Sequence, residues 1–196
     1  MSGKNDIEYI VGDEVTINEE NTNKQNTVSK TKNTFVFLEI WLVIVVLFSC
    51  VFAIHFVPTG SMNPTIKTNS FVFCWRLPYI FGNPTPQRGD IVSFYDENNS
   101  KILIKRVVGV PGDTISFENG DAYVNGKLLN EKYLLSSHSS YDPDGREYIV
   151  PADCVFVLGD NRENSADSRY MDNPYVKISK IYAKRLFSLF TLPSNK

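Results

Sequence analysis

The sequence predicts a mainly β protein: one N-terminal transmembrane helix followed by a small antiparallel β-sheet or half-barrel domain. Three observations predict this fold class. The longest apolar run, residues 35–57, is long enough to cross a membrane. The chain after it contains short runs rich in β-branched residues. Turn signals, among them Pro111-Gly112 and two Asn-Gly pairs, separate these runs.

The chain of 196 residues begins with a polar tail, residues 1–34, that has no apolar periodicity. A tail of this composition buries too little apolar surface to fold, so we expect it to be disordered. Residues 35–57 contain a single carboxylate, Glu39. A helix of that length would measure about 35 Å and cross a hydrocarbon core of about 30 Å. A buried core helix is the alternative, but the length of the run favours a transmembrane anchor.

A cleavable signal peptide is a second alternative for this run. It would need a shorter apolar core near the N-terminus and a small-residue cleavage site, and neither is present here. We therefore expect an uncleaved anchor. Lys24, Lys30 and Lys32 precede it, whereas Lys67 is the first basic residue after it. The positive-inside rule then predicts a cytoplasmic tail and an extracytoplasmic region at residues 58–196.

The strands expected after the anchor are defined by β-branched residues and turns. Residues 90–95 and 101–110 are two such runs, and a polar turn connects them. Asn119-Gly120 and Asn125-Gly126 are hairpin signals that predict a three-stranded meander at residues 113–129. Four further elements are expected: a surface loop at 136–147, short strands at 148–151 and 154–158, and a strand or a helix at 181–190.

An aromatic stretch at residues 71–82 has two interpretations. It fits a core strand followed by a proline turn. It also fits a surface at which Trp75, Tyr79 and Phe81 contact the membrane interface, where such rings are favoured. The sequence alone does not decide between the two.

The cysteines and the net charge exclude several functional classes. Cys50 lies within the apolar run, and no CxxC motif or Cys/His cluster occurs, so no metal site is expected. A disulfide between Cys74 and Cys154 is compatible with an extracytoplasmic location, but the apolar neighbours of Cys154 favour a buried thiol. A net charge of −2 gives no reason to expect a nucleic-acid partner.

The stretch VPTGSMNPTIK, residues 57–67, is the first candidate for chemistry. Gly60 permits close approach of the backbone, and a proline on each side of Ser61 stiffens the chain. A serine nucleophile also requires a base. His55 lies at the end of the anchor and His138 in a Ser-rich loop, so a Ser-His-Asp triad has little support.

The base that the sequence favours is Lys105. In a strand, Leu103, Lys105 and Val107 share one face, which places the amine among apolar neighbours. Desolvation there would lower the pKa of the lysine and leave a neutral amine that can take a proton from Ser61. A solvated lysine on an edge strand is the alternative.

Four blocks of sequence, in this order, resemble the bacterial type I signal peptidases, or leader peptidases. They are PTGSMNPT at residues 58–65, RGDIVSF at 88–94, KRVVGVPGD at 105–113 and GDNRENSADSR at 159–169. Together with the anchor, the resemblance covers residues 35–190, and its last block is highly specific.

The resemblance implies that Ser61 is the nucleophile and Lys105 the general base of a membrane-bound serine endopeptidase. It implies an oxyanion hole formed by the backbone N–H of Ser61 and the hydroxyl of Thr59. It also implies that Ser165 hydrogen-bonds and orients the lysine, and that Gly159 leaves the lysine room. Charged residues are implied to brace the site as two pairs, Asp160–Arg106 and Asp167–Arg169.

The substrates that the resemblance implies are signal peptides of exported pre-proteins, cleaved after small residues in the pattern Ala-x-Ala. Such a substrate would bind extended along a strand edge. No metal or cofactor is implied, because a nucleophile, a neutral amine and fixed donors suffice for acyl transfer. A lysine base points to the bacterial branch of the family. For that branch the resemblance implies a single-pass, monomeric protein of the plasma membrane, near the translocation machinery, with an extracytoplasmic catalytic domain at residues 58–196.

The sequence departs from the family pattern at two places. Only about 46 residues separate Gly112 from Gly159, so a large second domain has little room. After Arg169, Tyr-Met-Asp-Asn-Pro replaces the Tyr-aromatic-Gly pattern of the family. Pocket detail and substrate preference therefore stay open.

Three alternative functions are considered. Arg88-Gly89-Asp90 is the tripeptide of integrin-binding adhesion modules, but a strand follows it immediately, whereas an adhesive loop must be exposed at a turn tip. A self-cleaving Ser–Lys protease of the repressor type would be cytosolic, which the anchor argues against. A family member without activity would lack part of the site, yet all of the implied residues are present.

Overall fold

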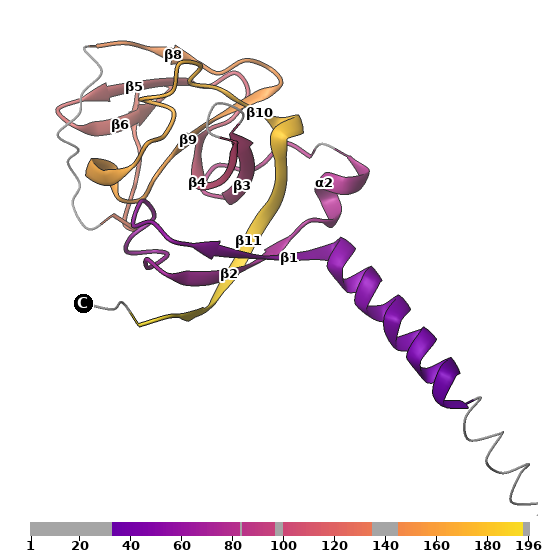
Figure 1. Ribbon diagram of the computed structural model, residues 1–196. Helices are drawn as coiled ribbons and strands as arrows, with labels where there is room; N and C mark the ends of the chain where they lie inside the picture. Colours follow the sequence, from indigo (N-terminus) through magenta and orange to yellow (C-terminus); the bar gives the residue numbers. More distant parts are fainter. Residues whose placement is uncertain (1–32, 83, 97–99, 135–144, 194–196) are drawn as a thin grey trace, which may run out of the picture. The chain divides into compact units, whose positions relative to one another are not determined.

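The computed structural model describes residues 33–82, 84–96, 100–134 and 145–193 (Figure 1). Nearly all of the predicted disordered tail, part of the polar turn after residue 96 and most of the loop that carries His138 lie outside the described residues. The chain divides into two compact units, residues 1–48 and 49–196. The described part of the first unit is entirely helical.

The N-terminal apolar helix extends from Asn33 to Val51, 19 residues, and within the described part of the chain it alone is long and apolar enough to cross a membrane. The prediction of a helix to residue 57 is wrong for its last six residues, which form strand β1 (Phe52–Val57). Strand β1 pairs antiparallel with β2 (Ser70–Trp75) along its whole length. Apolar residues fit a helix or a strand equally well, and this pairing decides for the strand.

The main sheet has seven antiparallel strands in the order β1-β2-β11-β3-β4-β9-β10 (Figure 1). Strands β1 and β10 are its two edges, so the sheet is open rather than a closed barrel. Strand β4, which carries Lys105, lies between β3 and β9. The strand bounds not yet given are β3 (Ile91–Asp96), β4 (Lys101–Gly109), β9 (Cys154–Leu158), β10 (Val176–Lys177) and β11 (Ile181–Thr191).

A second sheet of four strands has the order β7-β6-β5-β8. It consists of β5 (Thr114–Glu118), β6 (Asp121–Val124), β7 (Lys127–Leu128) and β8 (Tyr148–Ile149). The predicted meander is confirmed, because β5, β6 and β7 are consecutive antiparallel neighbours. Asn119-Gly120 and Asn125-Gly126 form its two turns, and all four of these residues have positive φ angles, as tight hairpin turns require.

Outside the N-terminal helix, the described helices are short: α2 (Leu77–Phe81), η1 (Arg162–Asn164) and η2 (Ile178–Lys180). The undecided segment at residues 181–190 is a strand. The aromatic stretch at residues 71–82 combines features of both interpretations, since Val72 and Cys74 are buried whereas Phe81 is exposed. The structure thus confirms a mainly β fold built from antiparallel sheets.

Candidate active site

Ser61 lies in the turn between β1 and β2, and the core holds this turn in place. The side chains of Met62 and Ile66 are fully buried in a cluster with residues of β1, β2 and the neighbouring strands of the main sheet. Backbone hydrogen bonds close the turn, from Ile66 N to Met62 O at 2.9 Å and from Asn69 N to Val57 O at 2.8 Å. Ser61 is itself buried. The stiffness predicted for this stretch therefore comes from packing as well as from its prolines.

Lys105 projects from β4 toward Ser61. Its Nζ donates a hydrogen bond of 2.7 Å to Ser61 Oγ, and the residue is only 3% exposed. Burial lowers the pKa of Lys105 from 10.5 to about 8, although the nearby carboxylates of Asp167 and Asp160 oppose this shift. The alternative of a solvated lysine on an edge strand is wrong, because β4 has neighbours on both sides.

Arg106, the next residue of β4, forms one of the two implied ion pairs. Its Nε donates to Asp160 Oδ1 at 2.8 Å and its Nη2 to Asp160 Oδ2 at 2.6 Å. Its Nη1 donates to the carbonyl oxygen of Gly89 at 2.8 Å. This two-point geometry fixes Asp160, which directly follows Gly159, to the main sheet.

The second implied ion pair is completely buried. Arg169 donates to Asp167 through Nε at 2.8 Å and through Nη2 at 2.9 Å, and both side chains are 0% exposed. Asp167 Oδ2 also accepts the backbone N–H of Gly159 at 2.9 Å. The carboxylate is thus satisfied by a cation and a backbone donor, as a buried charge requires.

Gly159 lies closer to Ser165 and Ser61 than to the lysine. A Cβ built on Gly159 would overlap Ser165 Oγ and would be 2.5 Å from Ser61 O. The glycine therefore leaves room for these two residues, and its implied role of leaving room for the lysine stays a prediction. The implied hydrogen bond between Ser165 and Lys105 is also not present, because Ser165 Oγ is buried without a partner among the described residues. Lys105 Nζ donates to Ser61 instead.

The two implied oxyanion donors, Thr59 and Ser61, are separated in the chain by Gly60 alone. Thr59 is exposed, two residues before Ser61. The backbone N–H of Ser61 has no acceptor within the described ranges. Both groups are therefore able to donate to an oxygen that approaches Ser61 from solvent.

Three residues that contribute to the site were not singled out from the sequence. Asn161 donates through its backbone N–H to Ser61 O and through Nδ2 to Gly60 O, both at 3.0 Å. Arg162 is buried and pairs with Glu131. Asn161 and Arg162 lie inside the specific block at residues 159–169, which is a signal that points to them. No sequence signal points to Glu131.

Other candidate residues lie in different surroundings. His55 Nε2 is 2.7 Å from the hydroxyl of Tyr182 and is not a partner of Ser61 in the structure. His138 lies outside the described residues. Cys74 and Cys154 are buried free thiols, so the disulfide alternative is wrong. No cluster that could hold a metal ion occurs among the described residues.

The Arg88-Gly89-Asp90 tripeptide is part of the turn that enters β3. Gly89 N donates to Val107 O at 2.8 Å, and the Asp90 carboxylate pairs with Lys184 Nζ at 2.7 Å. The Asp90 side chain is therefore used within the fold. This arrangement gives no support to an adhesion function, which needs the tripeptide displayed at a turn tip.

Comparisons with known proteins match most of the chain. The family model described as "Signal peptidase, peptidase S26" matches residues 30–190. A signal peptidase I of Bacillus caldolyticus is 36% identical over 145 residues, which cover 68% of this chain and 77% of the relative. A probable signal peptidase I-2 of Synechocystis is 34% identical over 148 residues, or 71% of this chain and 63% of the relative.

Other relatives are longer than this chain. A signal peptidase I of Pseudomonas aeruginosa is 32% identical over 178 residues, covering 71% of this chain and 62% of the relative. The chain thus spans less than two thirds of the Synechocystis and Pseudomonas proteins. The crystal structure of a signal peptidase I from Enterococcus faecalis V583 is 33% identical, covers 52% of this chain and 97% of that chain, and has a TM-score of 0.43. The fold described above rests on this chain's own structure.

Proposed function

This chain belongs to the signal peptidase family, peptidase S26, and on that premise we propose that it removes N-terminal signal peptides from exported pre-proteins. The observation that carries this proposal is the hydrogen bond of 2.7 Å between Lys105 Nζ and Ser61 Oγ in a buried site. A pKa of about 8 gives Lys105 a substantial neutral fraction near neutral pH. A neutral amine next to a hydroxyl is a general base next to a nucleophile.

In the acylation step, neutral Lys105 Nζ accepts the proton of Ser61 Oγ as this oxygen attacks the carbonyl carbon of the scissile bond. The carbonyl oxygen becomes an oxyanion that accepts hydrogen bonds from Ser61 N–H and the Thr59 hydroxyl. The intermediate collapses when the C–N bond breaks and Lys105 returns the proton to the leaving amine. The mature protein departs, and the signal peptide is held as an ester on Ser61.

In the deacylation step, Lys105 takes a proton from a water molecule that attacks the ester carbonyl. The second tetrahedral intermediate collapses, Ser61 Oγ regains a proton from Lys105, and the signal peptide leaves with a free carboxylate. Asp160 and Asp167 brace this chemistry through Arg106 and Arg169, because they hold the turn that packs against Ser61. No metal takes part in this scheme.

The substrate is proposed to bind as an extended strand. Strand β1 is an edge of the main sheet and leads directly into the turn that carries Ser61. Its outer backbone groups are able to pair with an incoming peptide, which is the general mode of strand addition. Cleavage after small residues in the Ala-x-Ala pattern is part of the proposal, carried by the family membership.

The protein is proposed to be a single-pass protein of the bacterial plasma membrane, with the helix Asn33–Val51 as its anchor. The three lysines nearest to the N-terminal end of the helix, Lys24, Lys30 and Lys32, favour a cytoplasmic N-terminus and an extracytoplasmic Ser61. Limited proteolysis of spheroplasts and of inverted vesicles tests this orientation. External protease should digest the region after residue 57 in spheroplasts only, and digestion in inverted vesicles only would contradict it.

Cleavage of a pre-protein whose signal peptide ends in Ala-x-Ala tests the proposed activity. Detergent-solubilised full-length protein should cleave it, and Ser61→Ala and Lys105→Ala should each lower kcat by about 10³-fold or more. Ser188→Ala and Lys127→Ala are matched controls, because both residues are exposed and belong to strands β11 and β7, outside the turns that form the site. A wild type that does not cleave, or an active Lys105→Ala variant, would overturn the proposal.

A further inference from the structure

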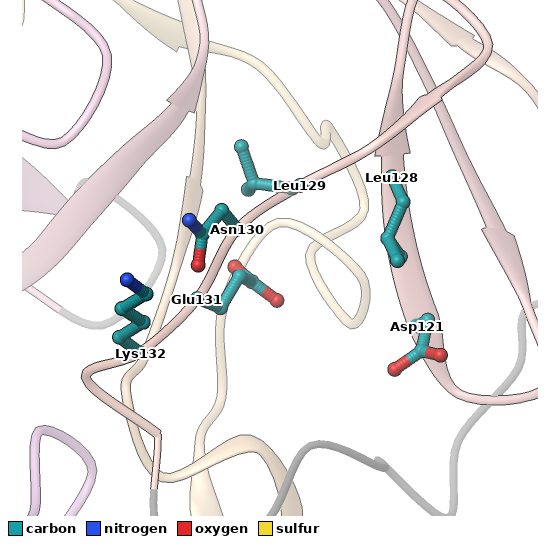
Figure 2. A pocket seen from close by; sticks show the side chains of 6 residues that line it. All are labelled: Asp121, Leu128, Leu129, Asn130, Glu131 and Lys132. Atoms are coloured by element: carbon teal, nitrogen blue, oxygen red, sulfur yellow. The ribbon is translucent and has the colours of Figure 1, made fainter.

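A short segment that leaves the four-stranded sheet after β7 contacts the charged residues of the site. Two of its side chains, Glu131 and Tyr133, make these contacts, although both lie outside the four blocks that resemble the family. Figure 2 shows Glu131 on this extended segment after Leu128, in the lining of a pocket of about 350 Å³. The Glu131 side chain is only 8% exposed.

Glu131 holds Arg162. Arg162 Nη1 donates to Glu131 Oε2 at 2.7 Å, and Arg162 Nη2 donates to Glu131 Oε1. The same guanidinium donates through Nε to the carbonyl oxygen of Gly159 at 3.2 Å. The carbonyl oxygen of Arg162 accepts a hydrogen bond of 2.7 Å from Arg169 Nη2. Without Glu131, Arg162 would be a buried cation with no carboxylate partner, which is strongly unfavourable.

Tyr133 contacts Arg106, the second arginine of the site that the segment holds. The guanidinium carbon of Arg106 lies 3.9 Å from the centroid of the Tyr133 ring, a close cation–π contact. The Tyr133 hydroxyl donates to Glu131 Oε1 at 2.6 Å, so the two side chains of the segment also hold each other. Arg106 in turn makes the two-point contact with Asp160.

The contacts of Glu131 with Arg162 and those of Tyr133 with Arg106 both lead to the turn formed by Gly159, Asp160 and Asn161. This turn touches the nucleophile directly, because Asn161 N donates to Ser61 O, and a Cβ built on Gly159 would overlap the Ser61 carbonyl oxygen and Ser165. A displacement of the turn would therefore move the Ser61 backbone relative to Lys105, whose position is set separately by β4. Reaction rates are sensitive to shifts of this kind.

We propose that Glu131 and Tyr133 are positioning residues of the active site, which fix the turn Gly159–Asn161 against Ser61 by holding Arg162 and Arg106. This inference rests on the proposed function of the Ser61–Lys105 pair and adds to it a part that comes from the second sheet. Neither residue has a hydrogen bond to Ser61 or Lys105, so both act through the two arginines.

Three substitutions separate the contacts. Glu131→Gln keeps the shape and removes the charge, Tyr133→Leu removes the ring, and Tyr133→Phe keeps the ring over Arg106 while removing the hydroxyl. With a signal-peptide substrate, Glu131→Gln and Tyr133→Leu should lower kcat by about 10- to 100-fold, with KM changed by less than about threefold. Tyr133→Phe should retain kcat within about threefold, since it keeps the cation–π contact.

Two matched controls come from the same sheet. Glu118→Gln and Tyr123→Leu replace the same residue types in β5 and β6, and both should leave kcat and KM unchanged. The positioning role is overturned if Tyr133→Leu loses no more kcat than Tyr133→Phe, or if the controls lose as much as Glu131→Gln and Tyr133→Leu.

A second measurement does not depend on cleavage. NMR titration of ¹³C-labelled lysine in the full chain should show the pKa of Lys105 rising from about 8 toward 10.5 in Tyr133→Leu, because a loosened site admits water. Tyr133→Leu changes no charge, so such a shift reports packing alone. An unchanged Lys105 titration would overturn the positioning role. If wild type fails to cleave while the titration shifts, the proposed function fails and the positioning role stands.

Discussion

Two regions of this molecule solve opposite physical problems. The turn at residues 159–169 and its partners bury charge: Lys105, Asp160, Arg162, Asp167 and Arg169 are each 5% exposed or less. The outer face of β1, β2 and β11 instead exposes aromatic carbon, with Phe187 at 49% and Phe190 at 56% exposure. We call the second region the phenylalanine face, formed by Phe52, Phe56, Phe71, Phe73, Phe187 and Phe190.

The phenylalanine face is continuous across the three strands. Phe71 stacks on Phe190 with ring centroids 4.8 Å apart, and it also contacts Phe56 at 5.1 Å. Phe73 contacts Phe52 at 4.9 Å and Phe187 at 5.2 Å. Ring contacts of this kind stabilise the sheet, while Phe187 and Phe190 stay about half exposed.

The two regions fit different surroundings, a protein interior for the charged turn and an apolar environment for the phenylalanine face. Buried charges are tolerated where every charge is paired, and the pairs also fix the geometry of Ser61 and Lys105. An exposed apolar patch of this extent is typical of a surface that meets a membrane or a partner. In the proposed function the first region supplies a dry site, and the second faces the lipid from which the substrate emerges.

Asp167→Asn should have the largest effect on stability. It removes the carboxylate that accepts two hydrogen bonds from the buried Arg169 guanidinium, which should lower the free energy of unfolding by about 3–5 kcal/mol. Urea denaturation of the detergent-solubilised chain measures this loss. Arg88→Ala is the control, because the Arg88–Asp113 pair is part-exposed and its loss should cost about 1 kcal/mol or less. Equal losses in the two variants would remove the distinction between buried and exposed pairs.

Lys105→Met should change how stability depends on pH. In the wild type, the unfolded chain binds more protons at this lysine than the folded chain between pH 8 and 10.5, so stability should rise with pH across this window. The full rise attributable to Lys105 is about 3 kcal/mol. Unfolding free energies at pH 7.5 and pH 10 should show this rise in wild type and not in Lys105→Met. The same pH dependence in both proteins would contradict a desolvated lysine.

Gly159→Ala should show how tightly the charged region is packed. Its Cβ would overlap Ser165 and the Ser61 carbonyl, so we expect a loss of about 1–3 kcal/mol in stability. Gly82→Ala is the matched control, because its φ of −172° is extended and the nearest atom, Pro78 O, lies at 3.8 Å. Thermal unfolding compares the two variants. An unchanged stability of Gly159→Ala would show that the turn can move away from Ser61.

Substitutions on the phenylalanine face should have the smallest effect on stability. Phe187→Ser and Phe190→Ser should change the free energy of unfolding by about 1 kcal/mol or less, since both rings are half-exposed. Contact with lipid is read from Trp75, the only tryptophan besides Trp41, in a Trp41→Phe background. Brominated lipids should quench Trp75 in reconstituted protein, and the two substitutions should weaken the quenching.

The control for this experiment is Ile149→Ser. Ile149 is 66% exposed on β8 of the second sheet, away from the phenylalanine face. It should leave the quenching of Trp75 unchanged. Unquenched Trp75 in the parent protein would show that the exposed rings do not meet the bilayer.

Much of the fold follows from local sequence signals. β-Branched runs and Asn-Gly turns predict β3, β4 and the meander, because they act over a few residues. Strand β1 was missed, since an apolar run that continues from a membrane helix has no local mark for the change to a strand. Its pairing with β2 depends on residues up to 23 positions away, as between Phe52 and Trp75.

The residues of the site also divide into those that local sequence predicts and those that depend on the fold. Ser61, Lys105 and the two ion pairs are predictable because they lie in blocks with a specific pattern. Glu131 and Tyr133 are not, because their roles arise only when the second sheet brings them to Arg162 and Arg106. The implied hydrogen bond between Ser165 and Lys105 is wrong, because it depends on where the Lys105 amine points, which residue spacing does not determine.

The pH dependence of signal-peptide cleavage tests the Ser61–Lys105 pair most directly. Only the neutral amine can act as the base, so kcat should rise about tenfold per pH unit at low pH and level off above a pH of about 8. Single-turnover cleavage measured from about pH 5.5 to about pH 10 gives this profile, since the range extends to both sides of the pKa of Lys105. A rate independent of pH across this range, or a bend near the ordinary histidine pKa of about 6.5, would contradict Lys105 as the general base.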